Sequence, residues 1–136
     1  MAITPYLYYR DVDAALKFLA KAFGFRKFGV PMKGPDGKIS HAAMKFGDEL
    51  IMMGRPPGTY RNPKQLRQTT QCLYINVDNV DKHFLRARKA GAKLLEEPTN
   101  TEYGHRRYGV TDPEGHEWYF AHELRTTDRK SRRIKE

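Results

Sequence analysis

The chain has 136 residues, of which 39% are hydrophobic and 30% are charged, and its formal net charge is +9. This length fits one compact domain, and the absence of any apolar run of roughly 18 residues excludes a membrane-spanning helix. The N-terminus lacks the basic and apolar regions of a signal peptide, and the single Cys72 cannot form an internal disulfide, so we expect a cytoplasmic protein.

Two segments account for most of the net positive charge. Residues 55–70 contain four Lys or Arg and no acid, and residues 125–136 contain six Lys or Arg against two acids. A basic tail attracts nucleic-acid phosphates without needing a specific fold, but a solvated tail explains the same composition. We therefore do not expect a nucleic-acid partner.

The first half of the chain reads as one strand, one helix and three strands. The strand is expected at residues 3–9, and the Asp-Val-Asp segment at 11–13 favours the start of a helix whose apolar residues recur at helical spacing. Gly24 is expected to end this helix. Three strand-like runs follow, at residues 25–30, 39–46 and 50–53.

The second half repeats this order. A strand is expected at residues 72–77, a helix begins at Asn-Val-Asp (79–81), and Gly91 ends it. The last three strands are expected at residues 92–95, 108–111 and 117–121. The two capping segments are 68 residues apart and the two glycines 67, which favours a duplication over a chance match.

The pattern predicts an α+β fold of two tandem βαβββ modules, at residues 3–54 and 71–124. Together they form a single domain, with a linker at residues 55–70 and a disordered or loosely ordered basic tail at 125–136. Each helix covers one face of its module's sheet, so the other face needs a partner, either the second module or a second chain. We expect curved mixed sheets around a cup.

Three stretches carry a family resemblance: "YYRDVDAALKFLAKAFGF", "YINVDNVDKHFLRARKAGAKLLEEP" and "YGHRRYGVTDPEGHEWYF". They resemble the vicinal oxygen chelate superfamily, which contains glyoxalase I, bleomycin-resistance proteins, fosfomycin-resistance enzymes and ring-cleaving dioxygenases. The resemblance covers most of residues 3–124 and implies a cup-shaped site, commonly completed in a homodimer. Because this fold hosts unrelated activities, the function has to be argued from the site itself.

The resemblance also implies where a metal would lie. In the enzymes of this superfamily, His and Glu side chains from four strands hold one divalent metal ion, which acts as a Lewis acid. Those positions fall here on Thr4, Ile51, Cys72 and Tyr119, and none of them is His, Asp or Glu. We therefore expect no metal cofactor.

Displaced ligands are the alternative that would restore a metal, and the candidates are His41, His105 and Glu117. Glu117 is two residues from Tyr119, about 6.6 Å along a strand, which is too far to replace a metal–oxygen bond of about 2.1 Å. Histidines at the starts of corresponding strands are more often hydrogen-bonded walls of a pocket.

The alternation of the strands, aligned with the family, places tyrosines and small polar residues in the cup. This pattern suits an aromatic-lined pocket, and tyrosines that fill a dry core would produce it as well. Arg107 is expected to meet either an acidic ligand or an internal acid such as Glu117. The candidate ligand-binding residues are His41, Tyr6, Tyr74, Arg107, Tyr108 and Tyr119.

The leading hypothesis is a metal-independent protein that binds a small anionic or neutral molecule, with any reaction left open. One alternative is a metal-dependent lyase or dioxygenase that uses displaced ligands, with His41 first among them. The other is a resistance protein that sequesters a drug. In each case the expected partners are a small molecule and a second copy of the chain.

Overall fold

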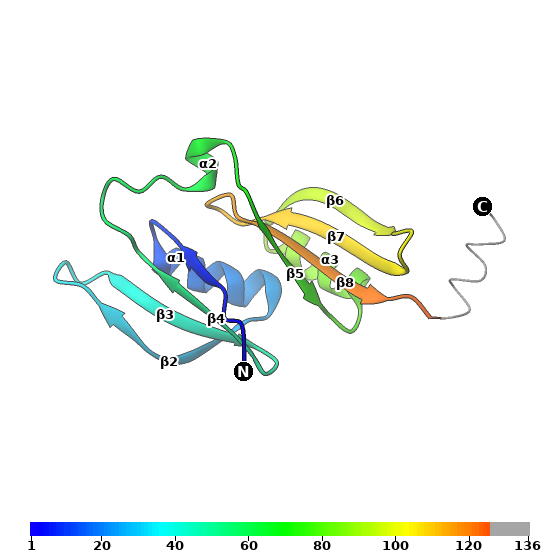
Figure 1. The fold of residues 1–136 in the computed structure, drawn as a ribbon, viewed down its shortest axis with the longest axis horizontal. Coiled ribbons are helices and arrows are strands. Elements are labelled where there is room, and N and C mark those ends of the chain that lie inside the picture. The colour runs from blue at the N-terminus through cyan, green and yellow to red at the C-terminus, as the bar shows by residue number, and fades with distance from the viewer. Residues whose placement is uncertain (126–136) are drawn as a thin grey trace.

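The structure is a computed structural model that describes residues 1–125 (Figure 1). It contains two four-stranded mixed sheets, with strand orders β1-β4-β3-β2 and β5-β8-β7-β6. Each sheet belongs to one βαβββ module, so the predicted α+β fold and its duplication are confirmed. Apart from Arg125, the predicted basic tail lies outside the described residues.

The first module comprises β1 (Tyr6–Tyr8), α1 (Val12–Phe18), a π-helical turn η1 (Leu19–Phe23), β2 (Arg26–Lys33), β3 (Ile39–Phe46) and β4 (Glu49–Gly54). The Asp11 side chain accepts a hydrogen bond from the Ala14 N–H and so caps α1. Gly24 follows the last helical turn with φ of +81°, a left-handed conformation that glycine adopts without strain. Both ends of this helix lie where the sequence places them.

The second module comprises β5 (Cys72–Asn76), α3 (Val80–Lys89), β6 (Lys93–Asn100), β7 (His105–Thr111) and β8 (Glu117–Glu123). The Asn79 side chain caps α3 by accepting from the Lys82 N–H, as Asp11 caps α1. Strand β6 runs five residues further than expected, because a shift of register near Glu96 lets it follow β7 past Pro98.

The linker contains a short helix that the sequence pattern did not predict, α2 (Pro63–Leu66). Asn62 and Gln65 form a capping box around its first turn, and Pro63 is its first residue. These three residues are a recognisable helix start, but four residues are too few to show a 3.6-residue apolar period.

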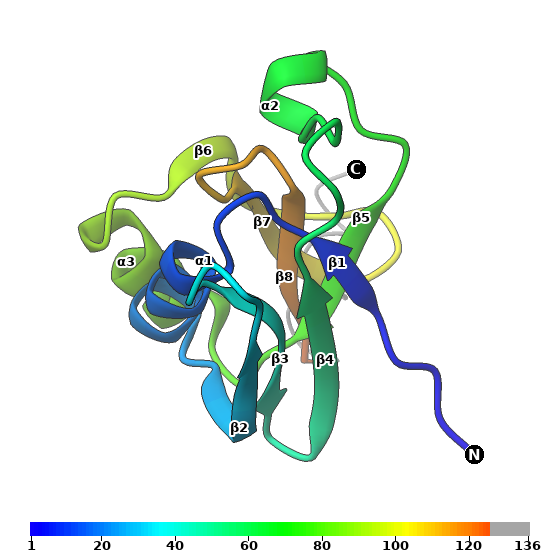
Figure 2. The same ribbon diagram turned by 90° about the vertical axis from the view of Figure 1, so that its left-hand side faces the viewer.

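The modules meet through their helix-covered sides. Helices α1 and α3 lie on one side of the molecule and β1, β4 and β5 on the other (Figure 2). Phe23 at the end of η1 packs against Trp118 and Phe120 of β8, with ring centroids 5.3 and 4.7 Å apart. The sheet faces turned away from the helices, called the open faces below, are therefore not used to join the modules. Among residues 1–125, no helix is both long and apolar enough to cross a membrane.

A buried carboxylate joins the modules at one end of this interface. Asp112, in the turn between β7 and β8, is 5% exposed and accepts hydrogen bonds from the Tyr9 hydroxyl (2.6 Å) and the Trp118 indole N–H (3.1 Å). Its other oxygen accepts from the N–H groups of Glu114 and His116. One side chain thus holds a turn of the second module and a tyrosine of the first.

A half-buried imidazole joins the modules at their helices. His83 of α3 contacts the Tyr108 hydroxyl through Nδ1, and its Nε2 lies 3.0 Å from the Phe23 carbonyl oxygen. Because a carbonyl only accepts, Nε2 carries the proton and Nδ1 accepts from Tyr108. Burial lowers the pKa of His83, so the ring is neutral in the folded protein at pH 7.

Replacing Asp112 with Ala should lower the free energy of unfolding by about 3 kcal/mol or more, because two buried side-chain donors lose their acceptor. Urea unfolding followed by tryptophan fluorescence measures this loss. Asp112→Asn keeps one acceptor oxygen and should cost less. Equal losses in the two variants would contradict the role assigned to the second oxygen.

His83 should make stability depend on pH with a defined sign. Its folded-state pKa lies below the unfolded value near 6.5, so its full contribution is present above about pH 6.5 and declines as the pH falls below it. The slope from this one group is at most about 1.4 kcal/mol per pH unit. Urea unfolding of wild type and His83→Gln from pH 7.5 to pH 5 should show the difference between them narrowing, and a constant difference would contradict this assignment.

Candidate functional site

The open face of each sheet carries tyrosines that solvent reaches. Along β1 and β5 the exposure alternates, so that Tyr6, Tyr8 and Tyr74 are exposed while Leu7 and Leu73 between them are half-buried. This is the alternation of a strand with one covered face and one open face. The open faces therefore present aromatic and polar side chains in both modules.

The duplication has placed the same pair of side chains on both open faces. In the first module the Tyr6 hydroxyl lies 2.9 Å from Nδ1 of His41, and in the second the Tyr74 hydroxyl lies 2.8 Å from Nδ1 of His105. Each tyrosine comes from the first strand of its module and each histidine from the third. The predicted residues Tyr6, His41 and Tyr74 thus lie in two matched Tyr–His pairs.

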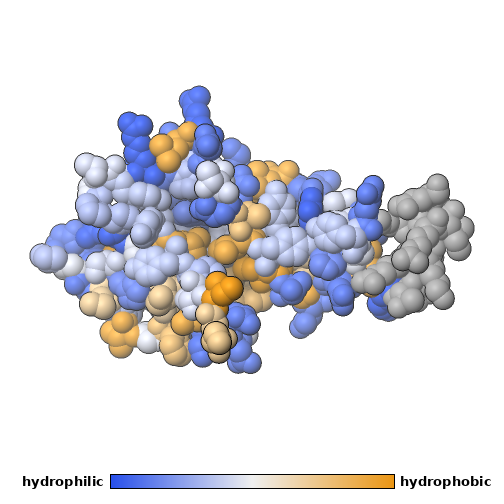
Figure 3. Space-filling view, in the orientation of Figure 1, coloured by the Kyte–Doolittle hydropathy of each residue, from blue (hydrophilic) through white to orange (hydrophobic). Residues whose placement is uncertain are grey.

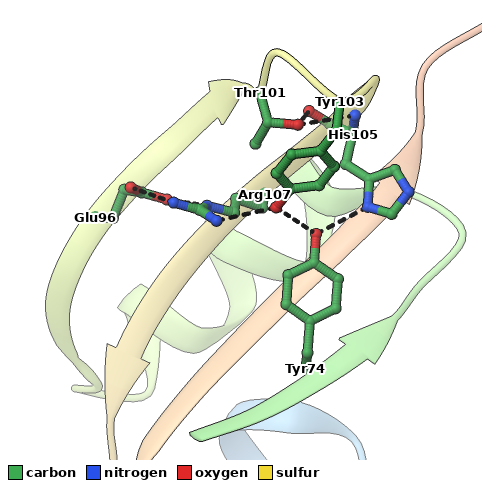
Figure 4. Close-up of polar contacts among 6 residues, drawn as sticks. All are labelled: Tyr74, Glu96, Thr101, Tyr103, His105 and Arg107. Atoms are coloured by element: carbon green, nitrogen blue, oxygen red, sulfur yellow. Dashed lines mark hydrogen bonds and ion pairs between the residues drawn. The ribbon is translucent and has the colours of Figure 1, made fainter.

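Only the second module extends this pair into a larger cluster (Figure 4). The Tyr74 hydroxyl lies 3.2 Å from the Tyr103 hydroxyl, which also accepts a hydrogen bond of 2.9 Å from Nη1 of Arg107. Arg107 donates from Nε and Nη2 to the two carboxylate oxygens of Glu96, at 2.8 and 3.3 Å. We call these five residues, Tyr74, Glu96, Tyr103, His105 and Arg107, the polar cluster.

A tight turn between β6 and β7 positions Tyr103. Thr101 is 8% exposed, and its hydroxyl both donates to the His105 carbonyl (2.9 Å) and accepts from the His105 N–H (3.0 Å). Gly104 completes the turn with φ of +87°. The Tyr103 side chain, 57% exposed, is therefore held on a closed hairpin end and still reaches solvent.

The side chains of the cluster shift one another's pKa values in different directions. The hydrogen bonds of Glu96 raise the pKa of Arg107, which stays charged. Burial, followed by the hydrogen bond with Tyr103, raises the pKa of Tyr74. The hydrogen bond with Tyr74, followed by the one with Arg107, lowers the pKa of Tyr103. Tyr74 therefore remains a protonated hydroxyl, whereas Tyr103 is the acceptor of the pair.

Tyr119 lies beside this cluster and contacts Arg107. Its ring lies 5.4 Å from the Arg107 guanidinium carbon, a cation–π distance. The ring passes over Gly109 of the neighbouring strand, where an added Cβ would lie only 2.5 Å from a ring carbon. The absence of a side chain at Gly109 thus allows Tyr119 to lie along the sheet.

Two sequence-based assignments need correction. Tyr108 is fully buried and contacts His83, because it follows Arg107 along β7 and adjacent strand residues point to opposite faces. It does not line the site. Ile51 is only 6% exposed and belongs to the hydrophobic core, so the open-face position on β4 is taken by Met52.

Arg107 has an internal acid for a partner, but that acid is Glu96 rather than Glu117. Glu96 was not predicted as its partner because the strand was expected to end at residue 95. Tyr103 was not predicted either, because it belongs to a turn and follows no strand alternation. The signal that could have found Tyr103 is the Tyr-Gly-His-Arg-Arg stretch at 103–107, which puts one aromatic and two basic residue types on a hairpin end.

The residues present do not fit a metal centre. Within residues 1–125, no three His, Cys, Asp or Glu side chains come together in an arrangement that could hold a metal ion. His41 and His105 are each hydrogen-bonded to the tyrosine of their own module. With Met52 in place of Ile51, the four positions implied by the family still include no imidazole or carboxylate.

Comparisons with known proteins agree with this fold. An uncharacterized protein of Mycobacterium bovis is 33% identical over 130 residues, which covers 91% of this chain and 84% of that protein. The crystal structure of TioX from Micromonospora sp. ML1 superposes with a TM-score of 0.72 at 31% identity, over 91% of this chain and 99% of that one. A glyoxalase/bleomycin resistance protein/dioxygenase family enzyme from Burkholderia phytofirmans gives 0.68 at 22% identity, over 89% and 97%.

The family model of the Glyoxalase/Bleomycin resistance protein/Dioxygenase superfamily matches residues 3–120, which include the first module, the second module as far as the middle of β8, and every residue of the polar cluster. Together with the duplicated βαβββ topology, this match shows that the chain belongs to that superfamily.

Proposed function

We propose that the protein binds a small anionic or neutral organic molecule on the open face of its second module, without a resident metal ion. The observation that carries this proposal is the polar cluster, in which five side chains from three strands and a hairpin turn are joined by hydrogen bonds on an accessible surface. A few convergent polar groups beside aromatic side chains are typical of a small-molecule site.

The chemistry of the cluster defines what it would recognise. Arg107 has five N–H groups, of which three are used by Glu96 and Tyr103, so two remain for a ligand oxygen. Tyr119 and Tyr74 offer aromatic surface beside these donors. An aromatic or apolar molecule with a carboxylate or carbonyl oxygen satisfies both features.

We further propose that a second copy of the chain covers the open faces. A groove of about 690 Å³ lies between the modules and is lined by apolar residues of the N-terminal segment, β4 and β5. Figure 3 shows hydrophobic side chains gathered near the middle of this face, between the positions of β4 and β5 in Figure 1. A homodimer would bury this surface and narrow the approach to the polar cluster.

Ligand binding should depend on the cluster and not on metal. A thermal-shift screen of aromatic carboxylic acids and aromatic ketones should find ligands that bind equally well with and without a chelator. Arg107→Leu should weaken the best ligand about 10-fold or more, the expected cost of losing a hydrogen bond to a charged group. Tyr74→Ala should also weaken it, because this change removes part of the aromatic surface.

Arg106→Leu is the matched control, because Arg106 is the neighbouring arginine and pairs with Asp81 of α3 instead. It should leave binding unchanged. One tightly held metal ion per chain, or binding that a chelator abolishes, would contradict the proposal. Native mass spectrometry of the same samples should show two chains, and a monomer at every concentration would contradict the dimer.

Gly109→Ala should change the site without removing a polar group. Its new Cβ would collide with the Tyr119 ring, so the ring must move, at a cost of about 1–3 kcal/mol in unfolding free energy and with weaker ligand binding. Gly58→Ala, where an added Cβ meets nothing within 4 Å, is the control and should change neither. Urea unfolding and calorimetry with the best ligand measure the two effects.

A further inference from the structure

The hydrogen bonds of the polar cluster converge on one oxygen atom, that of Tyr103. Arg107 has no acceptor, so its Nη1 donates to this oxygen at 2.9 Å. With the proton of His105 on Nδ1, the imidazole donates to the Tyr74 oxygen at 2.8 Å, and Tyr74 donates onward to Tyr103 at 3.2 Å. The Tyr103 oxygen then accepts two hydrogen bonds, one of them from a cation, which is the environment that stabilises a phenolate.

We propose that Tyr103 is a general base, which removes a proton from a neutral carbonyl compound bound beside Arg107. This inference rests on the proposed function, since the compound must first bind at the polar cluster. The substrate class is an aromatic ketone or aldehyde with an acidic C–H next to its carbonyl group.

The step balances without a metal, an oxidant or a reductant. The C–H bond beside the carbonyl breaks, its electron pair forms the enolate, and the proton passes to the phenolate oxygen of Tyr103. The negative charge that develops on the carbonyl oxygen is stabilised by the two remaining N–H groups of Arg107. Returning a proton from Tyr103 to carbon regenerates the phenolate, so the net result is proton exchange or isomerisation.

Tyr103 differs from the other perturbed tyrosines of the described chain. The pKa is raised, with burial as the first cause, in Tyr9, Tyr60, Tyr74, Tyr108 and Tyr119. Among the tyrosines of residues 1–125 whose pKa is shifted, only Tyr103 has a lowered pKa. The titratable groups that face it are Tyr74 of β5 and His105 and Arg107 of β7, and Glu96 of β6 pairs with Arg107.

The first module contains only part of the arrangement found in the polar cluster of the second module. It has the Tyr6–His41 pair but carries Ala43 two residues after its histidine, where the second module has Arg107 two residues after His105. The guanidinium and the second hydroxyl therefore belong to the second module only, and the accepting oxygen is confined to its open face.

The test has two readouts on the full-length protein. Tyrosine ionisation, followed by ultraviolet absorbance against pH, should show one residue that titrates below the usual value of about 10. This step should be missing in Tyr103→Phe and displaced to higher pH in Arg107→Leu. Tyr8→Phe, which removes a hydroxyl with no side-chain hydrogen bond among residues 1–125, should retain it.

The second readout is proton exchange on a probe, 2-indanone, whose methylene signals are followed by proton NMR in D2O. Wild type should exchange them roughly 10²-fold faster than Tyr103→Phe after subtraction of buffer catalysis, and the rate should rise with pH along the Tyr103 titration. Equal rates in wild type and Tyr103→Phe, or a rate that does not follow this titration, would overturn the base assignment.

The two proposals fail in different ways. If ligands found by the thermal-shift screen still depend on Arg107 and Tyr74 while Tyr103→Phe leaves exchange unchanged, the binding function stands and the base assignment falls. If wild type binds no member of the screen and exchanges 2-indanone no faster than buffer does, both fall.

Discussion

The carboxylate of Asp112 is the point at which both modules are fixed. It receives a hydroxyl from Tyr9, an indole N–H from Trp118 and two backbone N–H groups of its own turn. A buried carboxylate without these donors would cost several kcal/mol, so the four donors have to be brought together for the chain to fold. In the same turn, the Glu114 carboxylate accepts from the N–H groups of Arg10 and Asp11, which ties the start of α1 to this turn.

The turn at Asp112 also determines the geometry of the candidate site, although Asp112 does not contact that site. Strand β8 begins two residues after Gly115, so the turn sets the register in which Tyr119 lies beside Gly109 of β7. The same register puts Arg107 opposite Ala121, a small residue that leaves room for the guanidinium on the open face. The contact between the modules at Asp112 and the geometry of the polar cluster therefore both depend on the turn between β7 and β8.

Periodic features were predictable from the sequence, and local exceptions were not. The helix caps at Asp11 and Asn79 have a fixed spacing to the N–H groups they accept from, so the pattern identified them. The polar cluster depends on an irregular register in β6 and on the turn at Tyr103, and neither follows a period of two. Tyr108 is a different case, because it lies in the regular part of β7, where the alternation puts its side chain on the face opposite that of Arg107.

The charge balance of the cluster explains how this site differs from the metal site that its superfamily implies. A carboxylate at the position of Tyr119 would place a negative charge on the open face and would need a cation beside it. Here the nearest cation, Arg107, is balanced by Glu96, and Tyr119 contributes a neutral ring beneath it. The charge of Arg107 is therefore balanced within the polar cluster itself. Under the proposed function, the groups that would polarise a ligand are the hydrogen-bond donors held in place on β7 and its hairpin.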